Sequence, residues 1–332
     1  MFVVLHTGRR EAIDVARRTV TGLIEAGLSV RMLDDEAAEV GIDGVETVAA
    51  GGAATRDCEI VVVIGGDGTI LRGAELTRGS GTPLLGVNLG HMGFLAEAER
   101  DDLDYTVDHV VKQAYDVEER LTLDVAVRRD GEVLTEQWAL NEAAVEKAAR
   151  ERMLELVVEI DGRPLSRWAC DGVVCATPTG STAYAFSAGG PVVWPEVEAL
   201  LMAPISAHAL FARPMVIAPD SVVAVEVLAD TQGAGVLWCD GRRTVELPPG
   251  ARIEVRRGEL PVRLARLHRA PFTDRLVAKF DLPTMGWRGG QRRADRTAGP
   301  ATRSAGSAGN DRSTRSHTGT RPGPGSTGER DA

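Results

Sequence analysis

Ten residues, Ile60 to Thr69, constrain the fold more than any other part of the sequence. The run Ile60–Ile64 is apolar at every position, which is typical of a strand covered on both faces in a parallel sheet. The residues Gly65-Gly66-Asp67-Gly68-Thr69 follow directly, and a helical pattern covers residues 70–76. A buried strand, a glycine-rich turn and a helix in this order predict an open α/β sheet, which binds its ligands at the carboxyl ends of its strands.

The first third of the chain repeats this alternation of strand and helix. An apolar run at residues 2–5 and two mainly apolar runs at residues 28–33 and 83–87 have the length of strands. Strands that alternate with helices predict a parallel sheet, so residues 1–117 are predicted to form an α/β domain. The helical face between the first two runs consists of Ile13, Ala16, Val20, Leu23 and Ile24.

From about residue 118 the hydrophobic period changes to two. Leu121, Leu123, Val125 and Val127 alternate with other residues, and Asp161-Gly162 is one of two Asp-Gly pairs with the pattern of a hairpin turn. This pattern predicts a β-rich second domain over residues 118–270.

The end of the chain combines one helical pattern with a tail of biased composition. Phe272, Leu276 and Phe280 predict a short helix, and the segment 271–285 is expected to pack back on the first domain. Residues 291–332 contain no Leu, Ile, Val or aromatic residue. Such a segment buries too little apolar surface to offset its ordering entropy, so residues 286–332 are predicted to form a disordered tail.

The overall composition argues against several classes of protein. The formal net charge of −10 disfavours general nucleic-acid binding, and the absence of about 18 consecutive apolar residues disfavours a transmembrane helix. The start of the chain lacks a basic region ahead of a long apolar one, so no signal peptide is predicted. The four cysteines form no C-x-x-C pair, so we expect no disulfide framework or zinc knuckle, no membrane partner and a reducing, cytoplasmic location.

The glycine-rich turn has the chemistry of a phosphate site. Glycines let the backbone approach a ligand closely, and free N–H groups at a helix N-terminus favour an anion. Asp67 would lie at the carboxyl end of its strand, where it either contacts a ligand or serves as a structural N-cap. The sequence has no G-x-x-x-x-G-K-[ST] motif and no G-x-G-x-x-G after a strand, so neither a P-loop nor the usual dinucleotide fingerprint is present.

Several separated motifs together resemble one family. The first is Gly65-Gly66-Asp67-Gly68-Thr69, and the run from Gly86 to Leu95 is the second. Asn141-Glu142 and Asp171-Gly172 follow, and the most specific is the stretch from Thr177 to Tyr184 with the later Ala188-Gly189-Gly190-Pro191. Over residues 1–285 the chain resembles bacterial NAD kinases.

This resemblance implies a fold, a reaction and partners. The fold would be a Rossmann-like N-terminal domain with a β-sandwich-like C-terminal domain, and NAD would bind between them. The reaction would transfer a phosphoryl group from ATP, or polyphosphate in some members, to the 2′-hydroxyl of the adenosine ribose of NAD, giving NADP. A divalent metal, most often Mg²⁺, would assist the transfer, and its ligands are not identified. The family also implies a homo-oligomer, either a dimer or a tetramer.

The resemblance assigns roles to individual residues. Asp67 matches the catalytic base, which would also bind the ribose, and Gly68 and Arg72 match neighbouring binding positions. Asn141 and Glu142 match the pair that holds the adenosine half of NAD. Further NAD contacts are implied at Arg152, Asp171, Thr179, Thr182, Ala183, Tyr184, Ala185, Phe186 and Ser187.

Structural alternatives exist for these residues. By itself, the pair Asn141-Glu142 is typical of a solvated strand end, and the stretch 177–184 is typical of a hydroxyl-rich loop. Tyr184 would either stack on a ring of the ligand or pack in the core. Asp240-Gly241 has the pattern of a turn, and no role is assigned to it.

Two other functions share part of the pattern. Lipid and sugar kinases of the wider superfamily carry the glycine–aspartate turn, but a chain of that kind should lack the stretch 177–184. A non-catalytic NAD sensor should carry a changed Asp67 or Asn141-Glu142 pair, and both are intact. The sequence therefore favours an NAD-phosphorylating enzyme.

Overall fold

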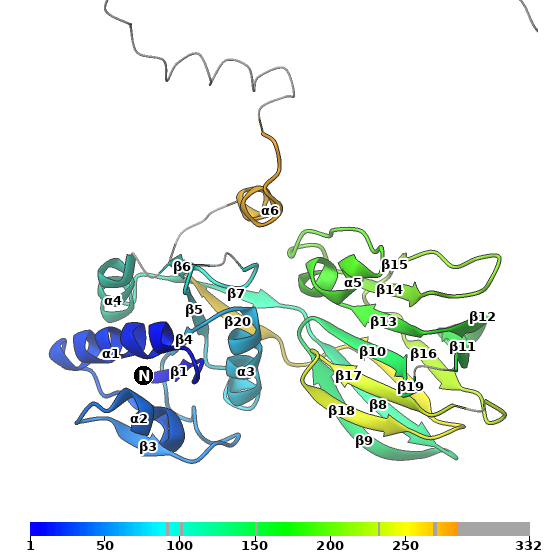
Figure 1. Ribbon diagram of the computed structural model, residues 1–332, viewed down its shortest axis with the longest axis horizontal. Coiled ribbons are helices and arrows are strands. Elements are labelled where there is room, and N and C mark those ends of the chain that lie inside the picture. The colour runs from blue at the N-terminus through cyan, green and yellow to red at the C-terminus, as the bar shows by residue number, and fades with distance from the viewer. Residues whose placement is uncertain (91–92, 100–101, 150–151, 232, 268–270, 285–332) are drawn as a thin grey trace, which may run out of the picture. The chain divides into compact units, whose positions relative to one another are not determined.

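The first third of the chain and two later strands form one mixed sheet. In the computed structural model the order of its strands is β3-β2-β1-β4-β5-β20-β7, with β6 paired to β5 (Figure 1). The strands from β3 to β20 are parallel, and β7 runs antiparallel to β20. The strands are β1 (Phe2–Leu5), β2 (Arg31–Leu33), β3 (Glu46–Val48), β4 (Val61–Ile64), β5 (Leu84–Asn88), β6 (Ala98–Glu99), β7 (Asp116–Arg120) and β20 (Val262–Arg266).

The central strand β4 is buried on both faces, as its unbroken apolar sequence predicts. Val62 and Ile64 belong to the core cluster that contains α1, whereas Val61 and Val63 pack with α3 in the cluster on the other face. The helices of this part are α1 (Arg10–Glu25), α2 (Asp34–Val40), α3 (Asp67–Thr77) and α4 (Leu103–Val111). The prediction of a parallel α/β sheet is confirmed.

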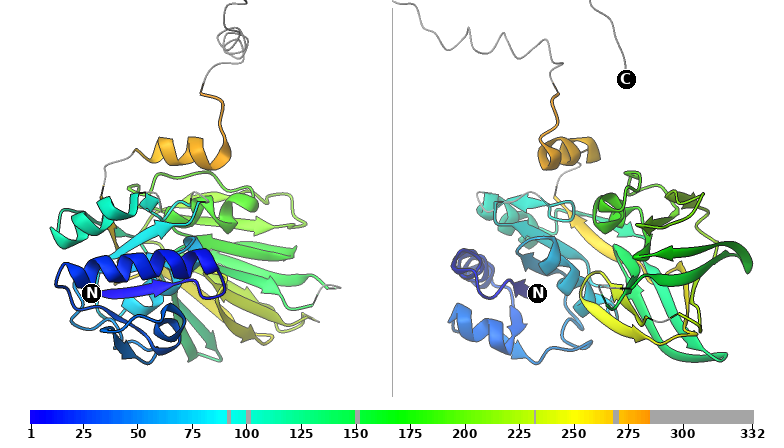
Figure 2. Two further views of the ribbon diagram at one scale, coloured as in Figure 1. Left: turned by 60° about the vertical axis from the view of Figure 1, so that its left-hand side comes forward. Right: turned by 45° about the vertical axis from the view of Figure 1, so that its right-hand side comes forward.

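Two antiparallel sheets form the β-rich part of the chain (Figure 2). Their orders are β15-β14-β13-β10-β17-β18 and β12-β11-β16-β19-β8-β9. One apolar core takes side chains from both sheets, for example Val125 and Val158 from one and Val145 and Val173 from the other. The sandwich-like arrangement is therefore confirmed. The strands are β8 (Leu123–Arg129), β9 (Glu132–Ala139), β10 (Glu142–Lys147), β11 (Leu154–Ile160), β12 (Arg163–Cys170), β13 (Gly172–Ala176), β14 (Leu200–Ile205), β15 (Met215–Ile217), β16 (Val223–Val227), β17 (Gly235–Cys239), β18 (Arg243–Leu247) and β19 (Arg252–Arg257).

Three short elements complete the fold. The stretch expected to be a loop forms a 3-10 helix (Thr179–Thr182) followed by the single-turn helix α5 (Tyr184–Ser187). The predicted C-terminal helix is present as α6 (Phe272–Phe280). Because β20 lies between β5 and β7, the chain returns to the mixed sheet just before α6.

The structure describes residues 1–90, 93–99, 102–149, 152–231, 233–267 and 271–284. The predicted disordered tail, residues 286–332, lies outside this part of the chain. No helix within these ranges is both long and apolar enough to cross a membrane.

Candidate active site

Asp67 begins α3 and reaches away from its own helix. The N-cap position belongs to Gly66, and Asp67 makes no capping hydrogen bond. Its carboxylate instead accepts two main-chain hydrogen bonds from the loop after β5. The N–H of Phe94 donates to Oδ2 at 3.0 Å and the N–H of Leu95 donates to Oδ1 at 3.2 Å. Asp67 therefore does not cap its own helix, which was the structural alternative.

Close packing of this loop on Asp67 requires glycine at position 93. A Cβ atom built on Gly93 would lie 2.1 Å from Asp67 Oδ1. Any side chain there would push the carboxylate and the loop apart. The position of Asp67 thus explains why the Met-Gly-Phe-Leu sequence has glycine at this place.

A cavity of about 470 Å³ opens beside the glycine-rich turn. Gly66, Gly68 and Thr69 from the start of α3 line it. Because it borders the N-terminus of α3, the helix dipole adds to the positive potential there. The other residues of its wall lie at the end of β1, directly follow it or carry guanidinium groups: Leu5, His6, Thr7, Arg9, Arg72 and Arg242. This combination suits the phosphates of a nucleotide.

Helix α6 contacts the loop after β5, whose N–H groups bind Asp67. Arg275 Nη1 donates to the carbonyl oxygens of Phe94 at 3.1 Å and Ala96 at 2.9 Å, and Nη2 pairs with Glu97 at 2.5 Å. The ring of Phe94 lies 5.9 Å from the ring of Phe280, also on α6. The loop is therefore bound through both its backbone and its aromatic side chain.

The pair Asn141-Glu142 is fixed by a buried carboxylate from the turn after β17. Asp240 Oδ2 accepts the N–H of Leu140 at 3.0 Å, and Oδ1 accepts the N–H of Asn141 at 2.7 Å and of Glu142 at 3.4 Å. Arg243 donates to Asp240 at 2.8 Å. The Asp-Gly pattern at position 240 indicated only a turn, yet its side chain orders the two residues expected to bind NAD.

The stretch 177–187 packs directly on the same pair. Thr177 Oγ1 donates to the carbonyl of Leu140 at 2.6 Å and accepts the N–H of Gly180 at 3.1 Å. A Cβ built on Gly180 would lie 2.0 Å from the carbonyl oxygen of Asn141. The N–H of Tyr184 donates to Glu142 Oε2 at 3.4 Å. Two motifs about forty residues apart in the sequence thus form one surface.

Burial changes the proton affinity of this surface. Desolvation and the nearby Asp240 together raise the pKa of Glu142 to about 8, against the N–H of Tyr184, which lowers it. Burial also raises the pKa of Asp240, against the three N–H groups and Arg243 that lower it. The pKa of the Tyr184 hydroxyl rises to about 12 because of burial and the neighbouring Glu146. Because Glu142 and Asp240 are adjacent and buried, the state in which one of the two carboxyl groups is protonated is favoured over the state in which both are charged.

Ion pairs connect α3 to this surface. Glu75 on α3 contacts Arg242 and Arg243, each at 3.1 Å, and Arg243 in turn holds Asp240. The guanidinium of Arg243 also lies 4.5 Å from the ring centre of Trp138. The helix that begins with Asp67 is therefore tied to the strand ends that carry Asn141-Glu142.

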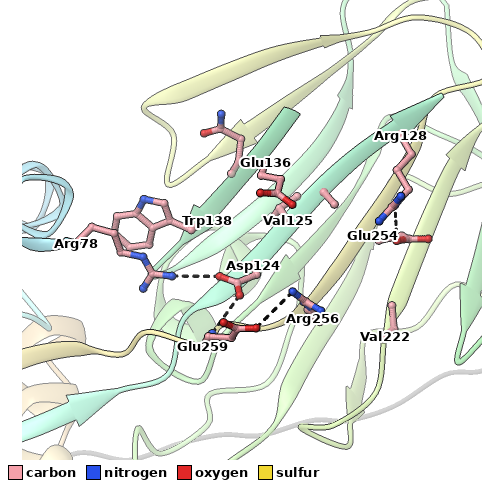
Figure 3. A pocket seen from close by; sticks show the side chains of 12 residues that line it. Arg78, Asp124, Val125, Arg128, Glu136, Trp138, Val222, Glu254, Arg256 and Glu259 are labelled. Atoms are coloured by element: carbon pink, nitrogen blue, oxygen red, sulfur yellow. Dashed lines mark hydrogen bonds and ion pairs between the residues drawn. The ribbon is translucent and has the colours of Figure 1, made fainter. Parts of the chain in front are cut away.

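A second cavity of about 460 Å³ lies over β8, β9 and β19 (Figure 3). It shares no lining residue with the cavity beside the glycine-rich turn. Two of its arginines are paired with acidic residues of the wall: Arg78 binds Asp124 at 3.1 Å, and Arg128 binds Glu254 at 3.0 Å (Figure 3). The first pair ties the C-terminal end of α3 to β8. Three arginines and four acidic residues line this cavity, so it does not have the character of a phosphate site.

The other predicted site residues lie at several distances from this centre. Asp171 pairs with Lys147 at 2.5 Å, at the end of β10 opposite to Glu142. Phe186 is exposed and stacks on Phe280 with ring centres 4.9 Å apart. Arg152 lies between β10 and β11. Thr179 and Ala185 are buried, Thr182 and Ala183 are partly buried, and Ser187 is exposed.

Sequence reasoning missed the residues that support the site from far along the chain. Arg275 belongs to no motif, Asp240 was assigned only to a turn, and the motif that contains Phe94 and Leu95 gave no sign that their backbone holds Asp67. The one available signal was Gly93 next to Phe94, inside a stretch already assigned to the family.

Models of both halves of one enzyme family match this chain. The ATP-NAD kinase N-terminal domain matches residues 1–115, and the ATP-NAD kinase C-terminal domain matches residues 140–267. NAD kinase 2 of Streptomyces avermitilis is 66% identical over 291 residues, which cover 87% of this chain and 96% of that protein. NAD kinase of Thermobifida fusca is 60% identical over 308 residues, which cover 90% of this chain and 94% of that protein.

Two solved structures share the fold at low sequence identity. Yeast NADH kinase complexed with NADH has a TM-score of 0.75 and 24% identity, covering 85% of this chain and 86% of that one. An NAD kinase from Archaeoglobus fulgidus in complex with ATP has a TM-score of 0.66 and 23% identity, covering 85% and 99%. The family models span most of the chain and the relatives are similar over nearly their whole length. The chain belongs to the ATP-NAD kinase family.

Proposed function

We propose that the site around Asp67 carries out the reaction of this family, with NAD as acceptor, NADP as product and ATP as phosphoryl donor. The chain is an NAD-phosphorylating enzyme. The observation that carries the proposal is the placement of Asp67. Its carboxylate accepts two main-chain N–H groups, and its chain neighbours Gly66 and Gly68 line a cavity that arginines also border.

Asp67 acts as the general base in this proposal. A ribose hydroxyl is a weak nucleophile, and a carboxylate within hydrogen-bond reach aligns it and takes its proton. The hydroxyl oxygen forms a bond to the terminal phosphorus of ATP, the bond from that phosphorus to the bridging oxygen breaks, and ADP leaves. Because main-chain N–H groups already fix the carboxylate of Asp67, the side chain needs no rearrangement before it acts on the substrate.

The donor phosphates occupy the cavity beside the turn. Gly68 and Arg72 line it, and N–H groups at the start of α3 point toward bound anions. Arginine suits this task because its planar fork binds phosphate oxygens in pairs. These groups neutralise the charge that develops during phosphoryl transfer.

The NAD acceptor binds on the surface built from Asn141-Glu142 and the stretch 177–187. Supporting this, Asn141 and Glu142 are anchored by Asp240, and Gly180 packs on the Asn141 carbonyl. Asp171, Arg152 and the residues from Thr179 to Ser187 would extend the contact along the dinucleotide. The hydroxyl and main-chain groups of this surface suit the ribose and amide groups of NAD.

The described residues also fit a metal that is shared with the substrates. They contain no group of three or more His, Cys, Asp or Glu side chains arranged to hold an ion unaided. Mg²⁺ is usually bound by one or two carboxylates together with substrate phosphates and water. The residues that line the cavity include no carboxylate, so the donor phosphates and water would supply the ligands of the ion, and Asp67 keeps its role as the base. The ion would neutralise phosphate charge during the transfer.

An activity assay tests the proposed function. The protein is incubated with NAD, ATP and Mg²⁺, and NADP is detected with an NADP-specific dehydrogenase. We expect NADP formation that depends on ATP, and its absence would contradict the proposal. A parallel reaction with polyphosphate decides whether this donor is also used.

Two further properties are proposed from the family and the composition. We expect a dimer or tetramer in solution, which a mass measurement by light scattering tests. The four cysteines are free thiols, which fits a reducing cytoplasmic compartment.

A further inference from the structure

Glu36 is a fully buried carboxylate at the start of α2, next to the cavity beside the glycine-rich turn. Its relative exposure is 0%. A buried charge is costly unless it is paired, so its retention at this position calls for a specific interaction. One of its oxygens accepts a main-chain hydrogen bond, and the other forms an ion pair with an arginine.

One oxygen of Glu36 completes the sheet. The pairing of β1 with β2 ends at Val3 and Met32. Leu5, two residues further along β1, donates its N–H to Glu36 Oε2 at 3.0 Å. The side chain therefore takes the place of a strand carbonyl at the carboxyl end of β2.

The other oxygen faces the cavity wall. Glu36 Oε1 lies 2.6 Å from Nη1 of Arg72, whose side chain is 27% exposed and lines the cavity. Arg72 is on α3, one and a half turns after Asp67. A free arginine side chain loses rotamer entropy when it is immobilised. Pairing with a rigid buried partner removes part of this cost before a ligand binds.

We infer that Glu36 is a positioning residue for the phosphoryl-transfer site: it holds Arg72 in the orientation that binds the donor phosphates. This inference rests on the proposed function, which assigns the cavity to the phosphates of ATP. Glu36 itself is covered by protein and acts only through Arg72.

The charge on Glu36 makes this arrangement sensitive to pH. Burial raises its pKa to about 7, against the lowering effects of the Leu5 N–H and of Arg72. The charged groups that act on it are Arg72 from α3 and Asp35 from its own helix. The neighbouring cations of α1 and β2 are engaged elsewhere, because Arg17 binds the Val40 carbonyl and Arg31 pairs with Glu46. Protonation of Glu36 below about pH 7 therefore removes the partner of Arg72.

Glu36→Gln separates the two tasks of this side chain. The amide oxygen still accepts the Leu5 N–H, whereas the neutral amide no longer pairs with Arg72. We expect the KM for ATP to rise by about tenfold, within the range of coupling between contacting residues, while the KM for NAD stays within about twofold. Glu39→Gln, at an exposed position of the same helix, is the matched control and should change neither constant.

The double variant with Arg72→Gln decides whether Glu36 acts through Arg72. Arg72→Gln alone should raise the KM for ATP, and adding Glu36→Gln should then change it by less than about twofold. If Arg72→Gln leaves the KM for ATP unchanged, the assignment of the cavity to ATP is wrong. Two outcomes would leave the proposed function standing, with Arg72→Gln raising the KM for ATP, and yet contradict the inference about Glu36. In the first, Glu36→Gln alone has the wild-type KM for ATP. In the second, Glu36→Gln raises the KM for ATP as much in the Arg72→Gln background as in the wild type.

A measurement on the wild-type residue keeps the inference testable if Glu36→Gln does not fold. Between about pH 8 and about pH 6 the KM for ATP of the wild type should rise more than that of Arg72→Gln. The titration of the phosphates themselves is common to both proteins and cancels in the comparison. Parallel pH profiles would overturn the inference.

Discussion

Phe94 donates its main-chain N–H to Oδ2 of Asp67 at 3.0 Å, and its carbonyl accepts a hydrogen bond from Arg275, 181 residues further along the chain. One peptide segment thus joins the proposed base to helix α6. Phe280 of the same helix packs its ring against the rings of Phe94 and of Phe186, a residue of the predicted NAD surface. The position of Asp67 therefore depends on a helix that carries none of the motifs of the family.

Arg275→Lys tests this dependence. Lysine keeps the positive charge, but its single nitrogen cannot hold two carbonyl oxygens and Glu97 in the planar arrangement of a guanidinium. We expect kcat to fall by about tenfold with a smaller change in either KM, because the loop that fixes Asp67 becomes looser. Arg263→Lys, at a half-exposed pair with Glu119, is the control and should keep full activity. Equal kcat values for the two variants would show that α6 does not influence Asp67.

Gly180→Ala tests the contact between the stretch 177–187 and Asn141. The added Cβ would lie 2.0 Å from the Asn141 carbonyl oxygen, which is backbone and must move. We expect the KM for NAD to rise by about tenfold or more and the protein to become less stable by about 1–3 kcal/mol. Gly52→Ala is the matched control, since nothing lies within 4 Å of its added Cβ. An unchanged KM for NAD would mean that Asn141 does not contact this substrate.

Glu142 gives the free energy of unfolding a pH dependence of known sign. Its folded-state pKa is raised from 4.5 to about 8 by burial and by Asp240. The stability that this shift contributes is complete below pH 4.5 and is lost as the pH rises to about 8. Relative to Glu142→Gln, the wild type should therefore lose up to about 1.4 kcal/mol per pH unit over this interval. Denaturant titrations of both proteins from about pH 5 to about pH 9 measure the difference. A difference that does not change with pH would contradict the raised pKa.

Local patterns predicted the fold well because they reflect burial on each element. The apolar run before Gly65 is a central parallel strand, and the alternation around Val125 belongs to an antiparallel sheet with one face in the core. The helix at 272–280 was also predicted from its spacing. The position of β20 was not, because the pairing of Leu264 with Leu84 joins residues 180 apart and leaves no local periodicity.

The site was predictable only where glycine and hydroxyl residues cluster in sequence. The turn at Asp67 and the stretch around Gly180 are motifs of this kind. The groups that hold them in place are single residues on distant elements, as Asp240 and Arg275 illustrate. Glu36 was hidden for a related reason. It looks like an ordinary first-turn helix acid, and only the end of β2 beside Leu5 explains its burial.

The kinetics of Asp67→Asn test the central claim most directly. Asparagine keeps the size of the side chain and one acceptor oxygen, so it retains one of the two main-chain hydrogen bonds of Asp67, but it is not basic. If Asp67 takes the proton of the ribose hydroxyl, kcat should fall by about 10²-fold or more, while the KM values for NAD and ATP stay within about threefold of those of the wild type. A thermal unfolding curve close to that of the wild type would exclude a general loss of structure. Near-normal turnover in this variant would contradict the assignment of Asp67 as the base.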